Sequence, residues 1–392
     1  MKEGWTYKKL GDVCNVLNGL WVGKKEPLVN IAVIRNTNFS KDCKLKLDDV
    51  AYIDVEEKQF KARKLQVGDI IIEKSGGSDK QPVGRPVLFN IPDGDYSFSN
   101  FTATLRLTDK SIIPQFLHQC LYGYYRNKET TKMQSKTTGL HNLDMKAYLR
   151  LPIPYISISE QERIVSELDL LSSIIEKKKA QLKEYDQLAQ SIFYDMFGDP
   201  VTNEKGWEVK KLGEICTTTS GGTPSKAHPE YYDGGTIPWL RSGEVSQGFI
   251  YKTELYITEE GLNNSSAKII PIDSVAIAMY GATVGQVGII KSPMSTNQAI
   301  CSVYPNDFFI PTYMFHFLLS KKNDFLKSAV GGAQPNISQD IIKKTLICIP
   351  PLSLQQQFAE KIEAIEKQKE MIKQSIAETE TLFNSRMDYY FN

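Results

Sequence analysis

An apolar pattern that extends over almost forty residues constrains the fold of this chain more than any other feature. Between Glu160 and Phe197, apolar side chains recur at alternating intervals of four and three residues, and only Lys178 interrupts the series of Ile164, Leu168, Leu171, Ile175, Leu182, Tyr185, Ala189, Ile192 and Met196. This spacing is typical of the seam of a coiled coil. At about 1.5 Å per residue the helix would be roughly 55 Å long, more than a small domain can cover. The pattern therefore predicts a partner helix.

The end of the chain supplies that partner, because the same register returns 194 residues later. From Gln355 to Phe391 the corresponding seam consists of Phe358, Ile362, Ile365, Lys369, Ile372, Ile376, Thr379, Phe383, Arg386 and Tyr390. The residues after Phe197 lead directly into the second half of the chain, whereas the first half begins close to Met1. Antiparallel pairing would give such a chain a pseudo-two-fold arrangement, so we expect the two helices to run antiparallel.

The segments between the helices also repeat. Residues Gly4–Cys14 (GWTYKKLGDVC) return as Gly206–Cys216 (GWEVKKLGEIC), and Asn142-Leu143 returns as Asn336-Ile337. Because the matched segments follow one another in the same order, the expected domains are residues 1–150, a central helix within 151–201, residues 202–347 and a C-terminal helix within 348–392. A gene duplication without functional symmetry is the plainer alternative.

Both globular halves have the pattern of a mixed α/β domain, so the fold class is α+β. Short apolar runs predict strands at 31–34, 69–72 and 103–107 in the first half and at 274–279 and 286–290 in the second. Pro114 and Pro311 each precede an apolar stretch that predicts a helix, at 114–125 and 311–320.

Charge is distributed unevenly along the 392 residues, although the net charge is only +1. Residues 1–150 carry 24 basic against 17 acidic side chains, residues 202–347 carry 13 of each, and both helical segments are acidic. A basic domain is suited to a polyanion. The six scattered cysteines and the lack of an eighteen-residue apolar run indicate a cytoplasmic protein without a structural metal.

The sequence contains no set of residues that predicts catalysis. It has no phosphate-binding Gly-x-x-x-x-Gly-Lys-Ser/Thr loop, and Pro350-Pro351 lacks the flanking residues of an adenine methyltransferase motif. The four histidines stand far apart, without the spacing of metal ligands.

Several motifs together resemble one family. They are the Gly-Trp…Leu-Gly pair, the Ile153-Pro154 that precedes Glu160–Val165 (EQERIV), and three further segments: Phe193–Asp199 (FYDMFGD), Ile237–Arg241 (IPWLR) and Gly281–Gly285 (GATVG). In their order and duplication they resemble the DNA-specificity (S) subunits of type I restriction-modification enzymes, over essentially the whole chain.

The resemblance implies two target-recognition domains and an antiparallel helical spacer that docks two methyltransferase subunits. It also implies a bipartite double-stranded DNA target, with two half-sites separated by a fixed gap. Adenine methylation and ATP-dependent cleavage would belong to methyltransferase and restriction subunits. The expected cofactors of those partners are S-adenosylmethionine, ATP and magnesium, with none in this chain. A coiled-coil assembly scaffold and a self-contained DNA-modifying enzyme remain the alternatives.

Candidate DNA contacts are polar or basic residues in glycine-rich loops, because such groups can read base edges or bind phosphates. In the first half they are Arg35, Asn36, Asn38, Lys74, Ser75, Gly76, Gly77, Lys80, Arg85, Lys136 and Thr138. In the second half they are Arg241, Ser242, Tyr280, Thr283, Asn297, Gln298, Gln334 and Asn336. The glycines could instead permit turns only, and an isolated asparagine could cap a helix.

Overall fold

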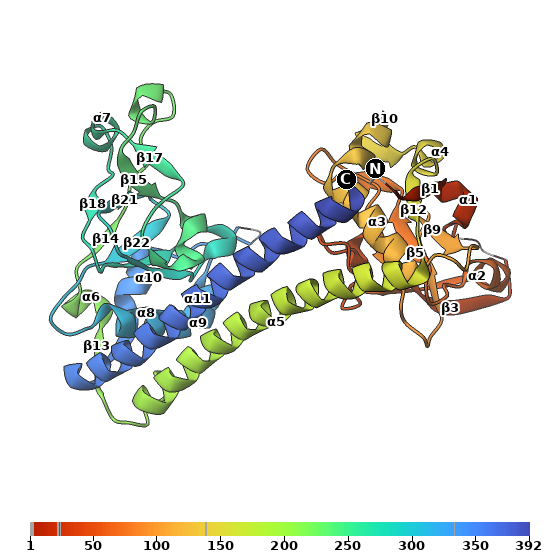
Figure 1. Ribbon diagram of the computed structural model, residues 1–392. Coiled ribbons are helices and arrows are strands. Elements are labelled where there is room, and N and C mark those ends of the chain that lie inside the picture. The colour runs from red at the N-terminus through yellow and green to blue at the C-terminus, as the bar shows by residue number, and fades with distance from the viewer. Residues whose placement is uncertain (1–3, 22, 24, 138, 333) are drawn as a thin grey trace. The chain divides into compact units, whose positions relative to one another are not determined.

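The computed structural model describes residues 4–21, 23, 25–137, 139–332 and 334–392. Contacts within the chain divide it into two compact units, which are Met1–Lys178 with Ser375–Asn392 (unit 1) and Lys179–Gln374 (unit 2). Two helices of forty residues each, α5 (Ile158–Phe197) and α11 (Leu352–Phe391), contribute to both units (Figure 1). Among the described residues, no helix combines the length and the apolar composition needed to cross a membrane.

The described residues in the globular part of unit 1 form four small sheets and four short α-helices. The first sheet has the strand order β2 (Cys14–Asn18), β9 (Thr102–Leu107), β5 (Ile70–Glu73), β7 (Pro86–Leu88), and the second has the order β4 (Ala51–Glu56), β3 (Leu28–Ile34), β8 (Tyr96–Phe98). The third has the order β10 (Gln134–Thr137), β11 (Leu140–Leu143), β6 (Ser75–Gly77), and the fourth pairs β1 (Thr6–Lys9) with β12 (Pro152–Tyr155). The helices are α1 (Leu10–Val13), α2 (Glu57–Arg63), α3 (Pro114–Arg126) and α4 (Met145–Tyr148).

Unit 2 has a closely related set of elements. One sheet has the strand order β14 (Thr218–Ser220), β22 (Ile300–Val303), β19 (Val275–Ala278), β20 (Val287–Ile290), β16 (Gly248–Ile250). Another has the order β17 (Leu255–Ile257), β15 (Ile237–Leu240), β21 (Met294–Thr296), β18 (Ile269–Ile270). A further sheet pairs β13 (Glu208–Lys211) with β23 (Leu346–Ile349). The helices are α6 (Leu212–Ile215), α7 (Glu259–Asn263), α8 (Pro311–Ser320), α9 (Lys322–Ser328) and α10 (Gln339–Lys344).

Strand pairing shows that the internal repeat is a repeat of topology. In unit 1, β5 lies between β9 and β7, both antiparallel to it, and in unit 2 β19 lies in the same way between β22 and β20. Likewise, β3 pairs antiparallel with β4 and parallel with β8, as β15 does with β17 and β21. The strands and the two shorter helices predicted from the sequence are confirmed within a few residues, as is the α+β class.

Two matched glycines explain part of the sequence repeat. A Cβ atom on Gly19 would lie 1.9 Å from the carbonyl oxygen of Ser99, and one on Gly221 would lie 2.0 Å from that of Thr296. Neither distance is compatible with a side chain, so both positions require glycine for close packing of the backbone.

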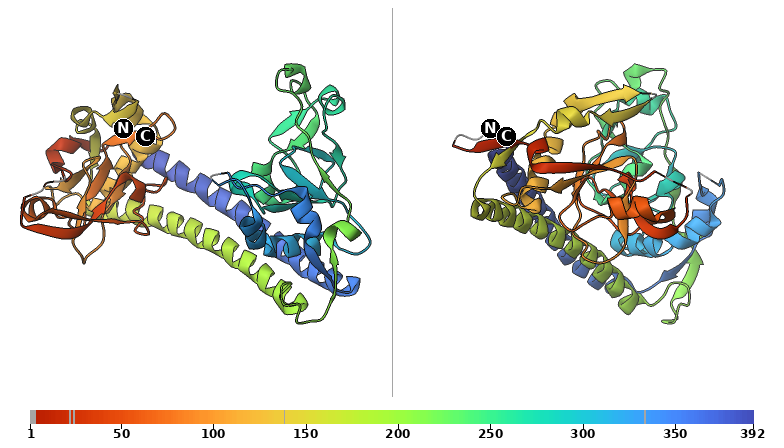
Figure 2. Two further views of the ribbon diagram at one scale, coloured as in Figure 1. Left: turned by 180° about the vertical axis from the view of Figure 1, so that it is seen from behind. Right: turned by 90° about the vertical axis from the view of Figure 1, so that its right-hand side faces the viewer.

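The long helices pack side by side and antiparallel within each unit (Figure 2). In unit 1, Glu167 pairs with Arg386 and Lys178 donates a hydrogen bond to Ser375. In unit 2, Asp186 pairs with Lys369 and the ring of Phe193 contacts that of Phe358. Residue numbers that rise along α5 are thus matched by numbers that fall along α11. The antiparallel pairing predicted from the sequence is confirmed.

The predicted seam is buried along most of its length. Ile164, Leu168, Leu171, Phe358, Ile362, Ile365 and Ile376 are buried, whereas Ile175, Leu182 and Ile372 are half-buried. Near the end of α5 the prediction was wrong by one residue, because Phe193 and Phe197 are buried while Ile192 and Met196 are only partly covered. Both phenylalanine rings also pack against Tyr313 of α8. Near its end α5 therefore packs against α8 as well as α11, so the residues that it buries differ from those of a two-helix seam.

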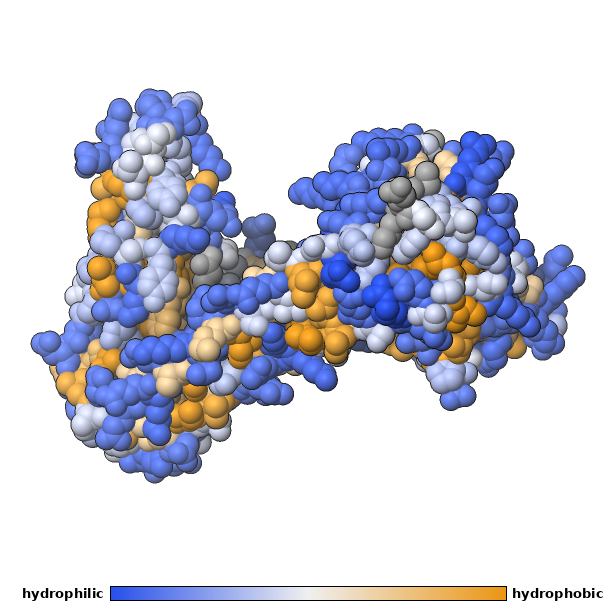
Figure 3. Space-filling view, in the orientation of Figure 1, coloured by the Kyte–Doolittle hydropathy of each residue, from blue (hydrophilic) through white to orange (hydrophobic). Residues whose placement is uncertain are grey.

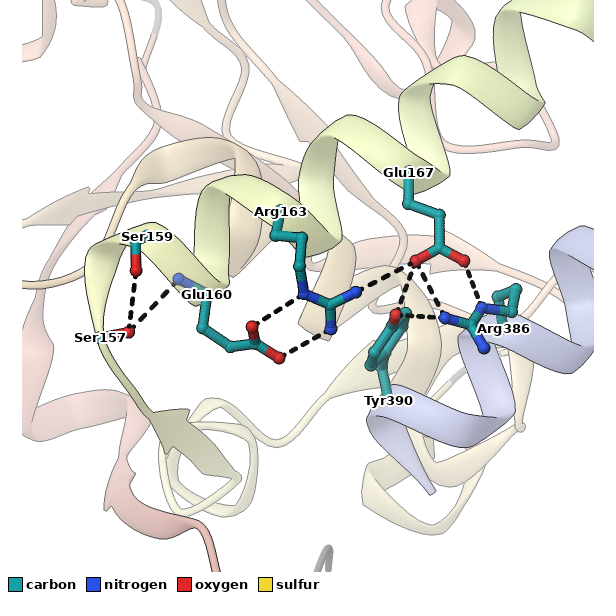
Figure 4. Close-up of polar contacts among 7 residues, drawn as sticks. All are labelled: Ser157, Ser159, Glu160, Arg163, Glu167, Arg386 and Tyr390. Carbon is teal, nitrogen blue, oxygen red and sulfur yellow. Dashed lines mark hydrogen bonds and ion pairs between the residues drawn. The ribbon is translucent and has the colours of Figure 1, made fainter.

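The cations that interrupt the seam have partners across it. Lys369 Nζ lies 2.8 Å from a carboxylate oxygen of Asp186, and the guanidinium of Arg386 binds the carboxylate of Glu167 (Figure 4). Tyr390 donates a 2.6 Å hydrogen bond to the same carboxylate, which lies 3.6 Å from Arg163. These contacts lower the pKa of Glu167, with the hydrogen bond from Arg386 as the largest cause.

Two matched glutamines attach the long helices to the globular parts. Gln161 accepts a hydrogen bond from the backbone N–H of Ile113 and donates to the carbonyls of Ser111 and Ile156, at 2.7–2.9 Å. Gln355 repeats this with Ile310, Phe308 and Pro350, at 2.8–3.0 Å. Both side chains are fully buried. Because a buried amide is costly unless its donors and acceptor are all satisfied, each glutamine fixes the start of its helix.

The buried His316 predicts a loss of stability in acid. Burial among Phe193, Phe358 and Lys369 lowers the pKa of His316 to about 4, so the unfolded chain takes up its proton first as the pH falls below about 6.5. The stability that depends on a neutral His316 is fully present above that pH. About 2 kcal/mol of the free energy of unfolding should be lost between pH 7 and pH 5. Burial likewise lowers the pKa of His118 to about 4, so thermal unfolding of the full chain at the two pH values measures the loss from both histidines.

The variant His316→Gln should reduce that pH dependence, whereas His228→Gln, at an exposed position, should leave it unchanged. Equal pH dependence in the wild type and in His316→Gln would contradict the assignment.

Candidate nucleic-acid interface

Most of the candidate residues of unit 1 meet in one group of loops, which we call loop cluster 1. It consists of the 3₁₀ helix η1 (Asn36–Asn38), strand β6 and strand β11, together with the residues that bond to them, which are Arg35, Lys74, Arg85, Phe101 and Lys136. The amide of Asn36 donates a 2.7 Å hydrogen bond to the carbonyl of Ser75, and the hydroxyl of Ser75 donates a 2.6 Å bond to the side-chain oxygen of Asn142. Segments that are almost seventy residues apart in the sequence are joined in this way.

Three predicted DNA contacts in loop cluster 1, Asn38, Gly77 and Arg85, are buried, and the side chains of Asn38 and Arg85 bind other parts of the protein. Asn38 accepts a hydrogen bond from the N–H of Arg35 and donates one to the carbonyl of Asp49, both at 2.9 Å. Arg85, with 3% of its side chain exposed, lies 3.0 Å from a carboxylate oxygen of Glu73, which is 1% exposed. The polar atoms of Asn38 and Arg85 are therefore used to hold the loops in place.

The other cations of this group lie at the surface. Arg35 donates to the carbonyl of Asp49 at 3.2 Å, and Lys136 lies 2.6 Å from the carboxylate of Asp79. Lys80 is exposed, whereas partial burial lowers the pKa of Lys74, which donates to Asn18 at 3.1 Å. Ion pairs at exposed positions contribute little stability, so such cations can exchange their partners for phosphates. Thr138 lies outside the described residues.

The candidate residues of unit 2 form a matching group, loop cluster 2. It consists of the 3₁₀ helices η4 (Ser242–Gln247) and η5 (Gly281–Thr283), which contact each other, and of the described loop residues 331–332 and 334–336. The N–H of Gly281 donates a 2.7 Å hydrogen bond to the carbonyl of Pro335, and that of Asn297 donates a 2.9 Å bond to the carbonyl of Leu240. These bonds bring together Arg241, Ser242, Tyr280, Thr283, Asn297, Gln334 and Asn336. Gln298 is exposed and accepts a hydrogen bond from Thr223.

The two clusters share a backbone plan but differ in their side chains. Arg35 and Arg241 each follow a central strand and precede a 3₁₀ helix, and each binds an acidic residue, Asp49 or Glu254. Gly76 and Gly281 both have a left-handed backbone, with φ of 96° and 67°. The scaffold is repeated, but some of the side chains on it differ, as Ser75 and its counterpart Tyr280 do.

Polar side chains dominate the outer loops of both units on the face shown in Figure 3, whereas hydrophobic side chains appear along the long helices. Among the described residues, no group of three or more His, Cys, Asp or Glu side chains could hold a metal ion. A cavity of about 240 Å³ in unit 1, lined by Tyr7, Tyr124, Pro152, Tyr390 and neighbouring residues, contains none of the predicted DNA contacts.

Two features of the clusters were not predicted from the sequence. Glu73 forms the buried ion pair with Arg85, and Phe101 stands exposed beside Ser75. Glu73 follows the apolar run of β5 directly, which is an unusual place for an unpaired charge and could have indicated a buried partner. Phe101 follows a short polar turn at Ser99-Asn100, where an aromatic side chain has no place in a core pattern.

Comparison with known proteins identifies the family. The family model described as the type I restriction modification DNA specificity domain matches residues 2–184 and again residues 204–381. The chain belongs to this family. The two matches fall on the two halves of the internal repeat, and the resemblance seen in the sequence is confirmed.

Relatives within the specificity family support this assignment. The chain is 29% identical over 311 residues to the specificity subunit of the type I restriction enzyme EcoR124I/EcoR124II of Escherichia coli, covering 76% of this chain and 75% of the relative. It is 21% identical over 406 residues to the putative MjaX specificity subunit of Methanocaldococcus jannaschii, covering 95% and 91%. The role of this chain is that of a type I restriction-modification specificity subunit.

Solved structures show the same fold. A chain from structural work on the assembly of the type I R-M system aligns with a TM-score of 0.61 and 19% identity, covering 100% of this chain and 98% of that one. The S subunit of a type I system from M. genitalium aligns with a TM-score of 0.56 and 14% identity, with the same coverage.

Proposed function

We propose that this chain is a non-catalytic specificity subunit that recognises a bipartite DNA target, with one half-site bound by each loop cluster. The observation that carries the proposal is the duplicated loop cluster. The same backbone plan occurs in both units, whereas the side chains that occupy it differ, as Ser75 and Tyr280 do. Two sites that share a backbone but carry different side chains fit two half-sites of different base sequence.

The chemistry of the exposed side chains supports DNA as the ligand. Amide and hydroxyl groups can pair with base edges, and cations and glycine-rich turns can bind phosphates. We propose direct DNA contacts for the exposed or half-exposed candidates, which are Arg35, Asn36, Lys74, Ser75, Gly76, Lys80, Lys136, Arg241, Ser242, Tyr280, Thr283, Asn297, Gln298, Gln334 and Asn336. Asn38, Gly77 and Arg85 would act by holding the loops in shape.

The long helices have two proposed roles: to set the gap between the half-sites and to dock partner subunits. Both helices keep exposed apolar side chains at matched positions, Ile158 with Leu352 and Leu188 with Leu382. Repetition of such side chains on otherwise polar surfaces favours two copies of one partner. The partners would be two methyltransferase subunits, joined by restriction subunits, and these would contribute S-adenosylmethionine, ATP and magnesium.

Substitution of one arginine tests whether each loop cluster binds one half-site. In a complex with methyltransferase subunits, Arg35→Ala should weaken binding about tenfold or more through one half-site, and Arg241→Ala should do so through the other. Gel-shift titrations with duplexes in which a single half-site is scrambled measure each effect separately. Wild-type binding should also weaken with rising salt, because phosphate contacts release counterions.

The control is Lys367→Ala, which removes an exposed cation of α11 that is paired with Glu363. It should leave both half-sites unaffected. If the two arginine variants lost affinity equally for both half-sites, the proposed division would be wrong, and methylation or cleavage of DNA by the chain alone would contradict a non-catalytic role.

A further inference from the structure

Each loop cluster presents one large aromatic side chain to solvent. Phe101 in unit 1 is 44% exposed, and Tyr280 in unit 2 is 46% exposed. A single exposed aromatic residue is common and needs no explanation. Two such residues at neighbouring points of a duplicated site need one.

Phe101 is anchored to the centre of loop cluster 1. Its carbonyl oxygen accepts hydrogen bonds from the N–H groups of Lys74 and Ser75, at 2.9 and 3.0 Å. Its ring lies over Gly76, because a Cβ placed on that glycine would be 3.6 Å from the ring atom Cδ1. The ring is therefore next to Ser75 and to Asn36, which bonds the carbonyl of Ser75.

Backbone hydrogen bonds define which residues correspond in unit 2. Lys74 N donates to Phe101 O in unit 1, as Met279 N donates to Ala299 O, at 2.8 Å, in unit 2. Ser75 therefore corresponds to Tyr280, and Phe101 corresponds to the buried Ala299. The two units place an aromatic residue at adjoining positions of the same scaffold but supply it from different segments, Phe101 from the turn before β9 and Tyr280 from the segment after β19. If the exposed ring had no function, the replacement of Phe101 by Ala299 in unit 2 would not need an aromatic residue at the neighbouring position.

The chemistry of the two rings narrows what they can contact. The side chain of Phe101 has no hydrogen-bond donor or acceptor, so its ring is suited to packing on an apolar surface. More than half of the surface of each residue is covered by protein, which leaves too little of the ring to insert between stacked bases as a wedge does. The apolar group that DNA offers among the polar edges of its major groove is the methyl group of thymine.

We propose that Phe101 and Tyr280 each pack on the methyl group of a thymine, one in each half-site, and so help to select A·T pairs there. This inference rests on the proposed function, because it requires each loop cluster to bind one half-site. It adds a specificity contact that depends on shape and apolar surface and not on charge.

Replacement of thymine by deoxyuridine tests the proposal, since it removes the methyl group and leaves base pairing intact. The full chain in complex with methyltransferase subunits would be titrated with duplexes that carry this replacement at one thymine at a time. At one position in each half-site, wild-type affinity should fall about three- to fivefold, as expected for the loss of one buried methyl group.

The variants assign each methyl contact to a ring. Phe101→Ala should abolish the deoxyuridine effect in its own half-site and retain it in the other, and Tyr280→Ala should do the reverse. Tyr280→Phe should keep the effect, because only the ring is required. Phe308→Ala, which removes a ring that is 41% exposed beyond the far end of β22, should change nothing. Phe101→Leu, with thermal melting, controls for folding.

Three results would overturn the inference. The first is wild-type affinity that does not respond to deoxyuridine at any position of a half-site. The second is a deoxyuridine effect that persists in Phe101→Ala and Tyr280→Ala. The third is a half-site made of G·C pairs alone. All three leave the proposed function standing if the complex still binds two half-sites, whereas a failure to bind any bipartite DNA overturns both.

Discussion

Arg85→Gln should destabilise unit 1 by about 3–5 kcal/mol, because it leaves the carboxylate of Glu73 buried without its cationic partner. The guanidinium of Arg85 also donates to the carbonyls of Phe39, Ser40 and Asn36, at 2.9–3.3 Å, and these acceptors would lose their donor. Burial already raises the pKa of Glu73, and Arg85 opposes that rise, so the variant should favour the protonated carboxyl. Thermal unfolding should show a decrease on the order of 10 °C.

Unit 2 suggests the matched control. Glu73 N donates to Arg85 O at 3.0 Å, as Ala278 N donates to Gln286 O at 2.9 Å, so the buried ion pair corresponds to an alanine and a glutamine in the second unit. The double variant Glu73→Ala with Arg85→Gln should therefore recover much of the stability that Arg85→Gln loses. A single variant that melts at the wild-type temperature would show that the pair does not hold loop cluster 1 together.

Lengthening both long helices should change the gap of the DNA target and leave both half-sites as they are. Seven residues inserted after Lys178 and seven after Gln374 add two turns to α5 and to α11, which is about 10 Å of helix. That length corresponds to roughly three base pairs of duplex. Affinity for the original gap should fall at least roughly 100-fold, and a target with a longer gap should restore it.

An insertion of three residues in each helix is the control, because it rotates the apolar seam out of register. It should lower the melting temperature and restore binding at no gap length. Binding titrations against a set of duplexes that differ only in the gap measure both outcomes. If the seven-residue variant recognised different bases, the helices would not act as a spacer alone.

The sequence predicted the long helices and the repeat because both depend on local periodicity. The antiparallel sense also followed, from the order of the segments. The burial of Phe193 and Phe197 did not follow, because it depends on Tyr313 of α8, which lies more than a hundred residues away. Periodicity describes one helix against one partner, and a third helix changes which face is covered.

The candidate DNA contacts were predictable as regions but not residue by residue. Loop, charge and glycine content placed most of them in two clusters, as the hydrogen bonds of Asn36 and Gly281 show. The same signals cannot tell a surface arginine such as Arg35 from a buried one such as Arg85, because the difference lies in Glu73 on a neighbouring strand. Phe101 was missed because it is apolar, and because its place beside Ser75, the counterpart of Tyr280, is visible only in the backbone pairing.

Sequencing of modified adenines in the host genome tests the central claim most directly. With the gene present, the account predicts methylation at one motif made of two short half-sites and a fixed gap of unspecified bases. Deletion of the gene should abolish methylation at that motif, and its return on a plasmid should restore it. An unchanged methylation pattern after deletion, or the loss of a continuous motif without a gap, would contradict a specificity subunit that reads two half-sites.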